Sequence, residues 1–255
     1  MGSIRVTFLG TGTSHGVPVI ACDCPVCKST DPRNKRTRTS ILVSYNGRNV
    51  LVDTTPELRI QALRCDVRRV DAVLFTHPHA DHIFGLDDIR RFCEIQGGSI
   101  PCYGNAETIE RIRVVFDYAF GPNVGGGVPR IELNVVDGEF ELFGLKIVPL
   151  KLLHGRMEVL GYRFGDVAYA TDCNHIPEET MERMRGLKLL ILDALRFAPH
   201  PTHFSLSEAL EVVEKLKPER TFFVHMTHDI DHEKVNSSLP PGVELAYDGL
   251  VVEVD

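Results

Sequence analysis

The segment Thr76-His77-Pro78-His79-Ala80-Asp81-His82 directly follows an apolar run at residues 72–75. It places three imidazoles and one carboxylate within six residues, although the chain has only 11 histidines among its 255 residues. A solvated polar turn is the alternative interpretation, but chance clustering at this density is improbable. Neutral imidazole and carboxylate ligands suit divalent ions such as Zn²⁺, Mn²⁺ or Fe²⁺. The segment therefore predicts a metal site.

The spacing of the ligand types within this segment indicates two ions. His77 and His79 lie two residues apart in an extended stretch, so their side chains project to the same side of the chain. Asp81 and His82 fall where a helix over residues 83–95 begins, so they can reach a second point a few ångströms away. We therefore expect two adjacent cations.

The overall composition is that of an ordinary globular protein, with 43% hydrophobic and 25% charged residues. A net charge of -7 argues against a large nucleic-acid footprint. No run approaches 18 apolar residues and the N-terminus leads straight into a strand-like segment, so we expect neither a membrane span nor a signal peptide. The cytoplasm is the expected location, where the seven cysteines would be thiols or metal ligands.

Strand and helix patterns recur along the whole chain without a polar linker, which predicts a single α/β domain over residues 1–255 with packed sheets and outer helices.

Two segments of the chain are rich in glycine. The run from Gly10 to Gly16 has the spacing G-x-G-x-x-x-G and is followed by Val17-Pro18 rather than a helix, which excludes a dinucleotide-binding loop. The segment 118–129, which contains Gly125-Gly126-Gly127, is either a mobile loop over a site or an ordinary connection.

Further ligand types follow strands elsewhere in the chain. His154 comes after the strand at 145–150, Asp172 after the strand at 167–170, and His225 after the strand at 221–224. Each residue alone would more often be structural. Because all three stand at strand ends, their joint pattern favours a metal centre, in which the carboxylate of Asp172 can bridge two cations.

A second cluster of ligand types lies near the N-terminus. Cys22, Cys24 and Cys27 supply three thiolates and lack the fourth ligand of a closed tetrahedral zinc site. His228, three residues after His225, is the natural fourth ligand. The sequence thus predicts one structural Zn²⁺, with three reduced and buried thiols as the alternative.

Taken together, the motif His77-x-His79-x-Asp81-His82 and the later ligand types resemble the metallo-β-lactamase superfamily. The resemblance spans nearly the whole chain. It implies an α/β fold, namely an αββα sandwich of two mixed sheets flanked by helices, with two catalytic divalent ions, Zn or Mn, at its edge. One ion would be held by His77, His79 and His154, the other by Asp81, His82 and His225, with Asp172 bridging them.

The cysteine run narrows the resemblance. Together with the spacing of His225 and His228, it is similar to the phosphodiesterases of the phosphonate carbon–phosphorus lyase pathway, which hydrolyse a cyclic phosphate. This resemblance implies a small-molecule phosphodiester substrate attacked by a metal-bound hydroxide. Asp81 would orient the hydroxide, and His203 matches the position of the general acid.

Three other expectations stay open at this point. A tRNA 3′-processing endonuclease of the same superfamily is one alternative function, although no basic arm for tRNA is evident in the sequence. A non-catalytic protein of cofactor biosynthesis with the same fold is the other. The chain is also compatible with a homodimer.

Overall fold

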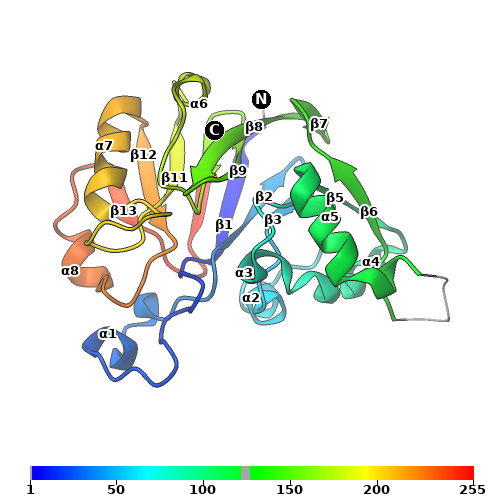
Figure 1. Ribbon diagram of the computed structural model, residues 1–255, viewed down its shortest axis with the longest axis horizontal. Coiled ribbons are helices and arrows are strands. Elements are labelled where there is room, and N and C mark those ends of the chain that lie inside the picture. Colours follow the sequence, from blue (N-terminus) through cyan, green and yellow to red (C-terminus); the bar gives the residue numbers. More distant parts are fainter. Residues whose placement is uncertain (1, 122–126) are drawn as a thin grey trace.

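The computed structural model describes residues 2–121 and 127–255. Residues 122–126 of the glycine-rich segment named above lie outside the described residues, so the role of that segment as a loop over a site stays untested. The described strands, labelled in Figure 1, are β1 (Ile4–Gly10), β2 (Ser40–Tyr45), β3 (Arg48–Val52), β4 (Ala72–Leu74), β5 (Ile100–Gly104), β6 (Ile131–Val135), β7 (Phe140–Leu142), β8 (Leu145–His154), β9 (Met157–Phe164), β10 (Val167–Ala170), β11 (Leu189–Asp193), β12 (Arg220–Val224), β13 (Val243–Leu245) and β14 (Val251–Val254). The described helices are α1 (Pro25–Lys28), α2 (Leu58–Arg64), α3 (Ala80–Ile83), α4 (Ile89–Gln96), α5 (Ala106–Val115), α6 (Glu178–Arg183), α7 (Leu206–Leu216) and α8 (His232–Asn236).

These strands form two seven-stranded sheets. The first has the order β14-β1-β2-β3-β4-β5-β6 and the second the order β13-β12-β11-β10-β9-β8-β7. Each sheet is mixed: the neighbours from β3 to β6 and from β10 to β13 are parallel, whereas the remaining pairs are antiparallel. The last strand returns to the first, with Val254 opposite Ile4. The expected pair of mixed sheets is thus confirmed.

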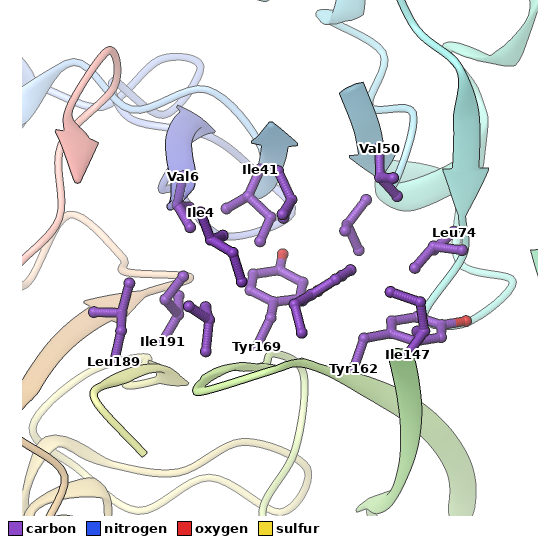
Figure 2. Close-up of a cluster of buried hydrophobic side chains, with 14 of the residues drawn as sticks. Ile4, Val6, Ile41, Val50, Leu74, Ile147, Tyr162, Tyr169, Leu189 and Ile191 are labelled. Carbon is purple, nitrogen blue, oxygen red and sulfur yellow. The ribbon is translucent and has the colours of Figure 1, made fainter. Parts of the chain in front are cut away.

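The two sheets pack face to face through apolar side chains. Figure 2 shows Val6, Ile41 and Val50 of the first sheet opposite Tyr162 and Tyr169 of the second, all of them buried. Side chains on one face of each strand fill this inner layer because successive residues point to opposite sides of the sheet. Burial of this layer supplies the main driving force for closing the sandwich.

Helices cover both outer faces, as expected. On the first sheet, Leu58 of α2, Phe92 of α4 and Ile112 of α5 pack over the outward side chains of the strands. On the second sheet, Ala209 and Val212 of α7 pack in the same way, together with residues of α8. The chain therefore forms four layers in the order helix, sheet, sheet, helix (Figure 1). None of the helices in residues 2–121 and 127–255 has the length and apolar character needed to cross a bilayer.

The prediction of one continuous helix over residues 83–95 is wrong. It is divided into α3, a 3₁₀ turn at Leu86–Asp88, and α4. The backbone of Thr54 donates to the carbonyl of His82 at 2.8 Å, and Gly85 donates to the carbonyl of Thr54 at 2.9 Å. A Cβ atom on Gly85 would lie 1.9 Å from the carbonyl oxygen of Thr55, so this close approach requires glycine. Contacts with a distant loop therefore end α3 early.

Candidate metal centre

The predicted ligand types meet because six strands end at one edge of the sandwich. Asp53 follows β3, the histidine segment follows β4, His154 ends β8, Asp172 follows β10, Asp193 ends β11 and His225 follows β12. The carboxyl ends of parallel strands share one edge of a sheet, and polar side chains placed there converge on a common site. Three of these residues have left-handed backbones, with φ values of 64° at Asp53, 52° at Asp172 and 62° at His225. Such conformations are uncommon outside glycine and turn each side chain away from its strand.

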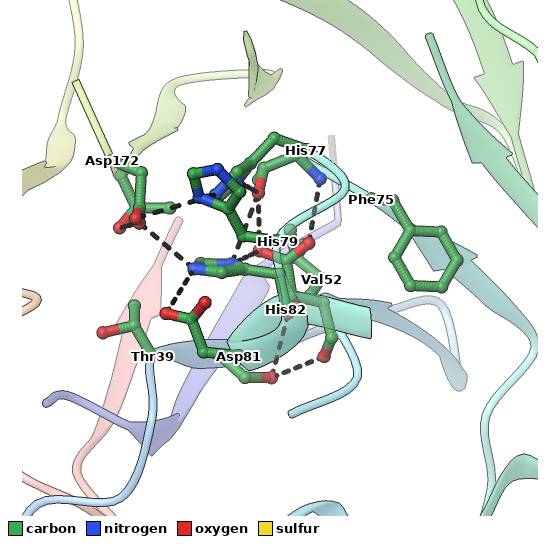
Figure 3. A network of polar contacts seen from close by, with 12 residues as sticks. Thr39, Val52, Phe75, His77, His79, Asp81, His82 and Asp172 are labelled. Atoms are coloured by element: carbon green, nitrogen blue, oxygen red, sulfur yellow. Dashed lines mark hydrogen bonds and ion pairs between the residues drawn. The ribbon is translucent and has the colours of Figure 1, made fainter. Parts of the chain in front are cut away.

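Four of the predicted ligands form a tight group. Asp81, His82, Asp172 and His225 each offer one ligand atom, and these atoms all lie within 4.8 Å of one another. Nε2 of His82 lies 3.3 Å from Oδ1 of Asp172 and 3.4 Å from Oδ2 of Asp81 (Figure 3). Nε2 of His225 lies 3.2 Å from Oδ2 of Asp172. Two ligands of one tetrahedral divalent ion would be separated by about 3.3 Å.

The unsatisfied nitrogens of this group also fit a metal ion. Nε2 of His82 and Nε2 of His225 are both buried, and neither has a hydrogen-bond partner among the described residues. A buried polar atom left without a partner is costly, and ordered ions are among the groups that satisfy such atoms. The donor set of imidazoles and carboxylates therefore fits a divalent cation.

The charges of this ligand group also favour a divalent cation. Burial raises the pKa of Asp172, but the imidazoles of His225 and His82 hold that pKa well below its usual value. Burial lowers the pKa of His225, yet Asp172 and Asp81 raise it to about 9. The buried carboxylates thus attract positive charge to this spot, and a divalent cation supplies that charge when it displaces the imidazole protons.

The three histidines predicted for the other ion are neighbours but less tightly grouped. Nε2 of His77 lies 3.0 Å from Nδ1 of His79, and 3.8 Å from Oδ2 of Asp172. The ring centroid of His154 lies 5.6 Å from that of His77 and 5.1 Å from that of His79. Asp172 therefore stands between the two predicted ligand sets, with its Oδ2 atom near His77 of one set and His225 of the other.

Asp53 fixes the orientation of two of these imidazoles. Its Oδ2 atom accepts from Nδ1 of His82 at 2.7 Å and from the hydroxyl of Thr76 at 2.8 Å. Because that hydroxyl has one proton, its oxygen accepts from Nδ1 of His77 at 2.9 Å. In both histidines Nε2 is then the ring nitrogen that faces Asp172, at 3.3 Å from His82 and 3.8 Å from His77. The sequence carries no separate signal for the role of Thr76, because this residue lies inside the histidine motif.

His154 is held by the loop on its other side. Its Nδ1 atom donates to the carbonyl of Thr202 at 2.9 Å, which leaves Nε2 free for the site. The turn after it requires glycine, since Gly155 has a φ of 65°. Asn174 accepts from the backbone of Gly155 at 2.8 Å and donates to the carbonyl of Pro201 at 3.0 Å. Asn174 thus ties this turn to the loop that carries His203, and no sequence signal singled it out.

The structure brings His203 into the same site. Nδ1 of His203 lies 2.8 Å from Oδ2 of Asp193. Its ring stacks on that of His225 with centroids 4.6 Å apart and lies 4.6 Å from that of His154. Two residues later Ser205 begins α7 with a capping box formed with Glu208, which fixes the end of this loop. His203 therefore borders the ligand group with its Nδ1 atom occupied by Asp193.

The structure also brings the three cysteines of the predicted zinc cluster close to His228. Nδ1 of His228 lies 3.1 Å from Sγ of Cys22 and 3.5 Å from Sγ of both Cys24 and Cys27. Sulfur and nitrogen ligands of one tetrahedral Zn²⁺ are separated by about 3.5 Å. The backbone N–H of Cys27 lowers the pKa of the Cys24 thiol to about 7, which favours the thiolate that binds metal. These residues fit a structural zinc ion.

Four hydrogen bonds hold the chain around the segment that joins His228 of this cluster to His225 of the ligand group. The backbone of Met226 donates to Thr11 at 3.1 Å and accepts from Thr13 at 3.2 Å, so the glycine loop after β1 braces the residue after His225. The buried guanidinium of Arg36 donates to the carbonyls of Thr227 at 3.0 Å and Ile230 at 2.8 Å. The short segment between His225 and His228 is therefore held from both sides.

Comparison with known proteins shows the family to which this chain belongs. Residues 48–226 match the model of the Beta-lactamase superfamily domain. The crystal structure of a diphosphatase from the PhnP family superposes with a TM-score of 0.93 at 47% identity, covering 99% of this chain and 97% of that one. The Zn²⁺-bound PqqB of Methylobacterium extorquens superposes with a TM-score of 0.79 at 21% identity, covering 98% of this chain and 100% of that one, which shows a shared fold alone.

One similar protein is much longer than this chain. It is an octanoyltransferase of Porphyromonas gingivalis, 36% identical over 257 residues that cover 99% of this chain. The chain spans only 52% of the length of that relative. The name of the longer protein therefore does not say which half performs the acyl transfer.

Proposed function

The chain belongs to the beta-lactamase superfamily as a metal-dependent hydrolase, and we propose that it hydrolyses a small phosphodiester that is cyclic or nucleotide-like. The position of Asp172 carries this proposal. Its Oδ1 atom lies 3.3 Å from His82, and its Oδ2 atom lies 3.2 Å from His225 and 3.8 Å from His77. A carboxylate shared in this way suits two adjacent cations, which is the arrangement that favours in-line displacement at phosphorus.

Under this proposal, Asp81, His82 and His225 would hold one ion and His77, His79 and His154 would hold the other, with Asp172 between the two ligand sets. Two Zn²⁺ or Mn²⁺ ions supply Lewis-acid polarisation of a phosphoryl oxygen and a nucleophilic hydroxide at neutral pH. Residues behind the ligands orient the imidazole rings. Asp53 and Thr76 hold the Nε2 atoms of His82 and His77 toward the centre, because their Nδ1 protons are already donated.

Asp81 and His203 take the two roles in proton transfer. Burial raises the pKa of Asp81, but His82 and His225 hold the pKa well below its usual value, so this residue stays a carboxylate and orients the attacking water. His203 donates its Nδ1 proton to Asp193. Its imidazolium form therefore carries the transferable proton on Nε2, passes that proton to the departing alkoxide and becomes a neutral imidazole. General acid catalysis of this kind contributes about 10²–10⁴-fold to the rate.

The similarity to a PhnP-family diphosphatase supports chemistry at phosphorus rather than at a lactam or thioester. The octanoyltransferase name is not carried over, because this chain accounts for only 52% of that protein. We further propose that Cys22, Cys24, Cys27 and His228 hold a structural Zn²⁺, on the strength of the 3.1 Å to 3.5 Å separations between their sulfur and nitrogen atoms.

A substrate panel tests the function. Protein reconstituted with Mn²⁺ or Zn²⁺ is offered nucleoside cyclic phosphates, linear phosphodiesters, nucleoside diphosphates and a tRNA precursor, and the products are identified by mass spectrometry. We expect turnover of small phosphodiesters. Cleavage of the tRNA precursor alone would point to the endonuclease, and no turnover of any compound would point to a non-catalytic role. Asp71→Asn is a suitable control, because this buried carboxylate lies at the opposite end of β4.

A further inference from the structure

A groove of about 580 Å³ opens beside the metal centre. One wall is formed by Pro78, His79 and Ala80, which belong to the metal-binding segment itself. His79 therefore faces both the proposed catalytic ion and the groove. The groove begins at a proposed ligand. A group bound in the groove can therefore be joined by a short covalent link to a phosphoryl group at the metal centre.

The opposite wall is one face of α5. It presents Glu107, Glu110, Arg111 and Val114, which follow the spacing i, i+3, i+4 and i+7 of a single helical stripe. The buried residues Ile109 and Ile112 lie on other faces of the helix, and Ile112 packs into the core cluster on the outer face of the first sheet. The helix thus exposes a continuous mixed stripe along the groove, opposite the ligand segment.

The apolar part of the groove is unusually exposed. The Phe84 side chain is 50% exposed and the Val114 side chain is 58% exposed, and both line the groove together with Met157. Phe84 directly follows α3, whose Asp81 and His82 are proposed ligands, while Met157 begins the strand after His154. An aromatic ring, a thioether and a branched aliphatic group beside a catalytic centre suit a flat apolar ligand.

The charged part of the groove selects the same kind of ligand. Two carboxylates, Glu107 and Glu110, face it with a single guanidinium, that of Arg111, so the wall has no excess of positive charge for a second phosphate. The three charged groups disfavour a lipid chain. They suit a ligand with several hydroxyl or amino donors, because carboxylates accept hydrogen bonds from such groups.

We propose that this groove binds the nucleoside of a nucleotide-like phosphodiester, with the base against Phe84, Val114 and Met157 and the sugar hydroxyls toward Glu107 and Glu110. This inference rests on the proposed function and specifies its substrate class. The groove volume lies within the range of small-ligand sites, which is about 300–1,000 Å³. The phosphate then lies at the metal centre, on the His79 side of the groove.

Two esters with the same leaving group test the catalytic consequence. Thymidine 5′-(p-nitrophenyl phosphate) and methyl p-nitrophenyl phosphate both release p-nitrophenolate and differ only in the presence of the nucleoside. We expect Phe84→Ala to raise KM for the thymidine ester about 10-fold, with kcat little changed, since base stacking on an aromatic ring is worth that much. KM for the methyl ester should not change. Phe143→Ala, at a 37% exposed aromatic residue in the turn between β7 and β8, is the matched control.

Direct binding separates the groove from the activity. Thymidine is titrated into metal-loaded protein with ¹³C-labelled methionine methyl groups, whether or not either ester is hydrolysed. We expect the Met157 signal to shift, the signals of the buried Met184 and Met226 to stay in place, and Phe84→Ala to weaken the binding about 10-fold. A Met157 signal that does not move, or equal KM changes for both esters in Phe84→Ala, would overturn the nucleoside site.

Discussion

The Oδ2 atom of Asp53 lies 2.7 Å from Nδ1 of His82 and also accepts from Thr76, which in turn accepts from His77. One buried carboxylate therefore orients an imidazole from each of the two proposed ligand sets. This relationship joins two segments 20 or more residues apart in sequence, since Asp53 follows β3 and the histidines follow β4.

Asp53→Asn should weaken the binding of the catalytic metal by about 10–100-fold, the usual cost of losing a partner behind a ligand. Asparagine tolerates the φ of 64° at this position, so the fold should persist. The measurement is competition between the protein and a chelator of known affinity, with Asp71→Asn as the control. Equal metal affinity in wild type and Asp53→Asn would show that the hydrogen bonds do not support the ligands.

His203→Ala should slow alkyl phosphodiesters by about 10²–10⁴-fold, whereas p-nitrophenyl esters should lose far less. The difference arises because an alkoxide needs a proton on departure and p-nitrophenolate does not. Rates for both ester types are compared in His203→Ala and in His200→Ala, a neighbouring histidine whose ring lies 5.2 Å away. Equal losses on both ester types would remove His203 from the acid role.

Cys24→Ser should lower the metal content by one equivalent and lower the melting temperature, while the catalytic residues stay in place. The physical reason is that a structural Zn²⁺ contributes its binding energy to folding. Metal content is measured by elemental analysis, and Cys65→Ser, a half-buried thiol outside the cluster, is the control. An unchanged metal content in Cys24→Ser would leave the cluster as three reduced thiols.

His232 should make stability sensitive to acid. Burial, together with the positive charges of Arg33 and Arg36, lowers the pKa of this histidine to about 4, whereas the unfolded value is about 6.5. The unfolded chain then binds the proton more readily, so the stabilisation present above pH 6.5 is lost as the pH falls toward 4. His232→Gln does not titrate, so its free energy of unfolding should fall by about 2 kcal/mol less than that of wild type between pH 7 and pH 5. The free energies of unfolding are measured in urea at both pH values. An equal decrease from pH 7 to pH 5 in wild type and His232→Gln would contradict this.

Much of the candidate site was predictable because its ligands stand directly at strand ends, where the pattern of apolar residues stops. His154, Asp172 and His225 are examples. The division of the helix predicted over 83–95 was not predictable, since it depends on Thr54 bonding to a carbonyl of α3. The same holds for Thr76 and Asn174, whose roles arise from partners far away in sequence. Local patterns predict elements, whereas contacts between loops set how those elements end.

The most direct test of the central claim is hydrolysis of bis(p-nitrophenyl) phosphate by Mn²⁺- or Zn²⁺-loaded protein, compared with Asp172→Ala. Asp172 is the carboxylate near both proposed ligand sets, with atoms 3.3 Å from His82 and 3.8 Å from His77. The wild-type protein should release p-nitrophenolate and Asp172→Ala should not, although both should keep the zinc of the cysteine cluster. Full activity in folded Asp172→Ala would contradict a mechanism that depends on two bridged ions.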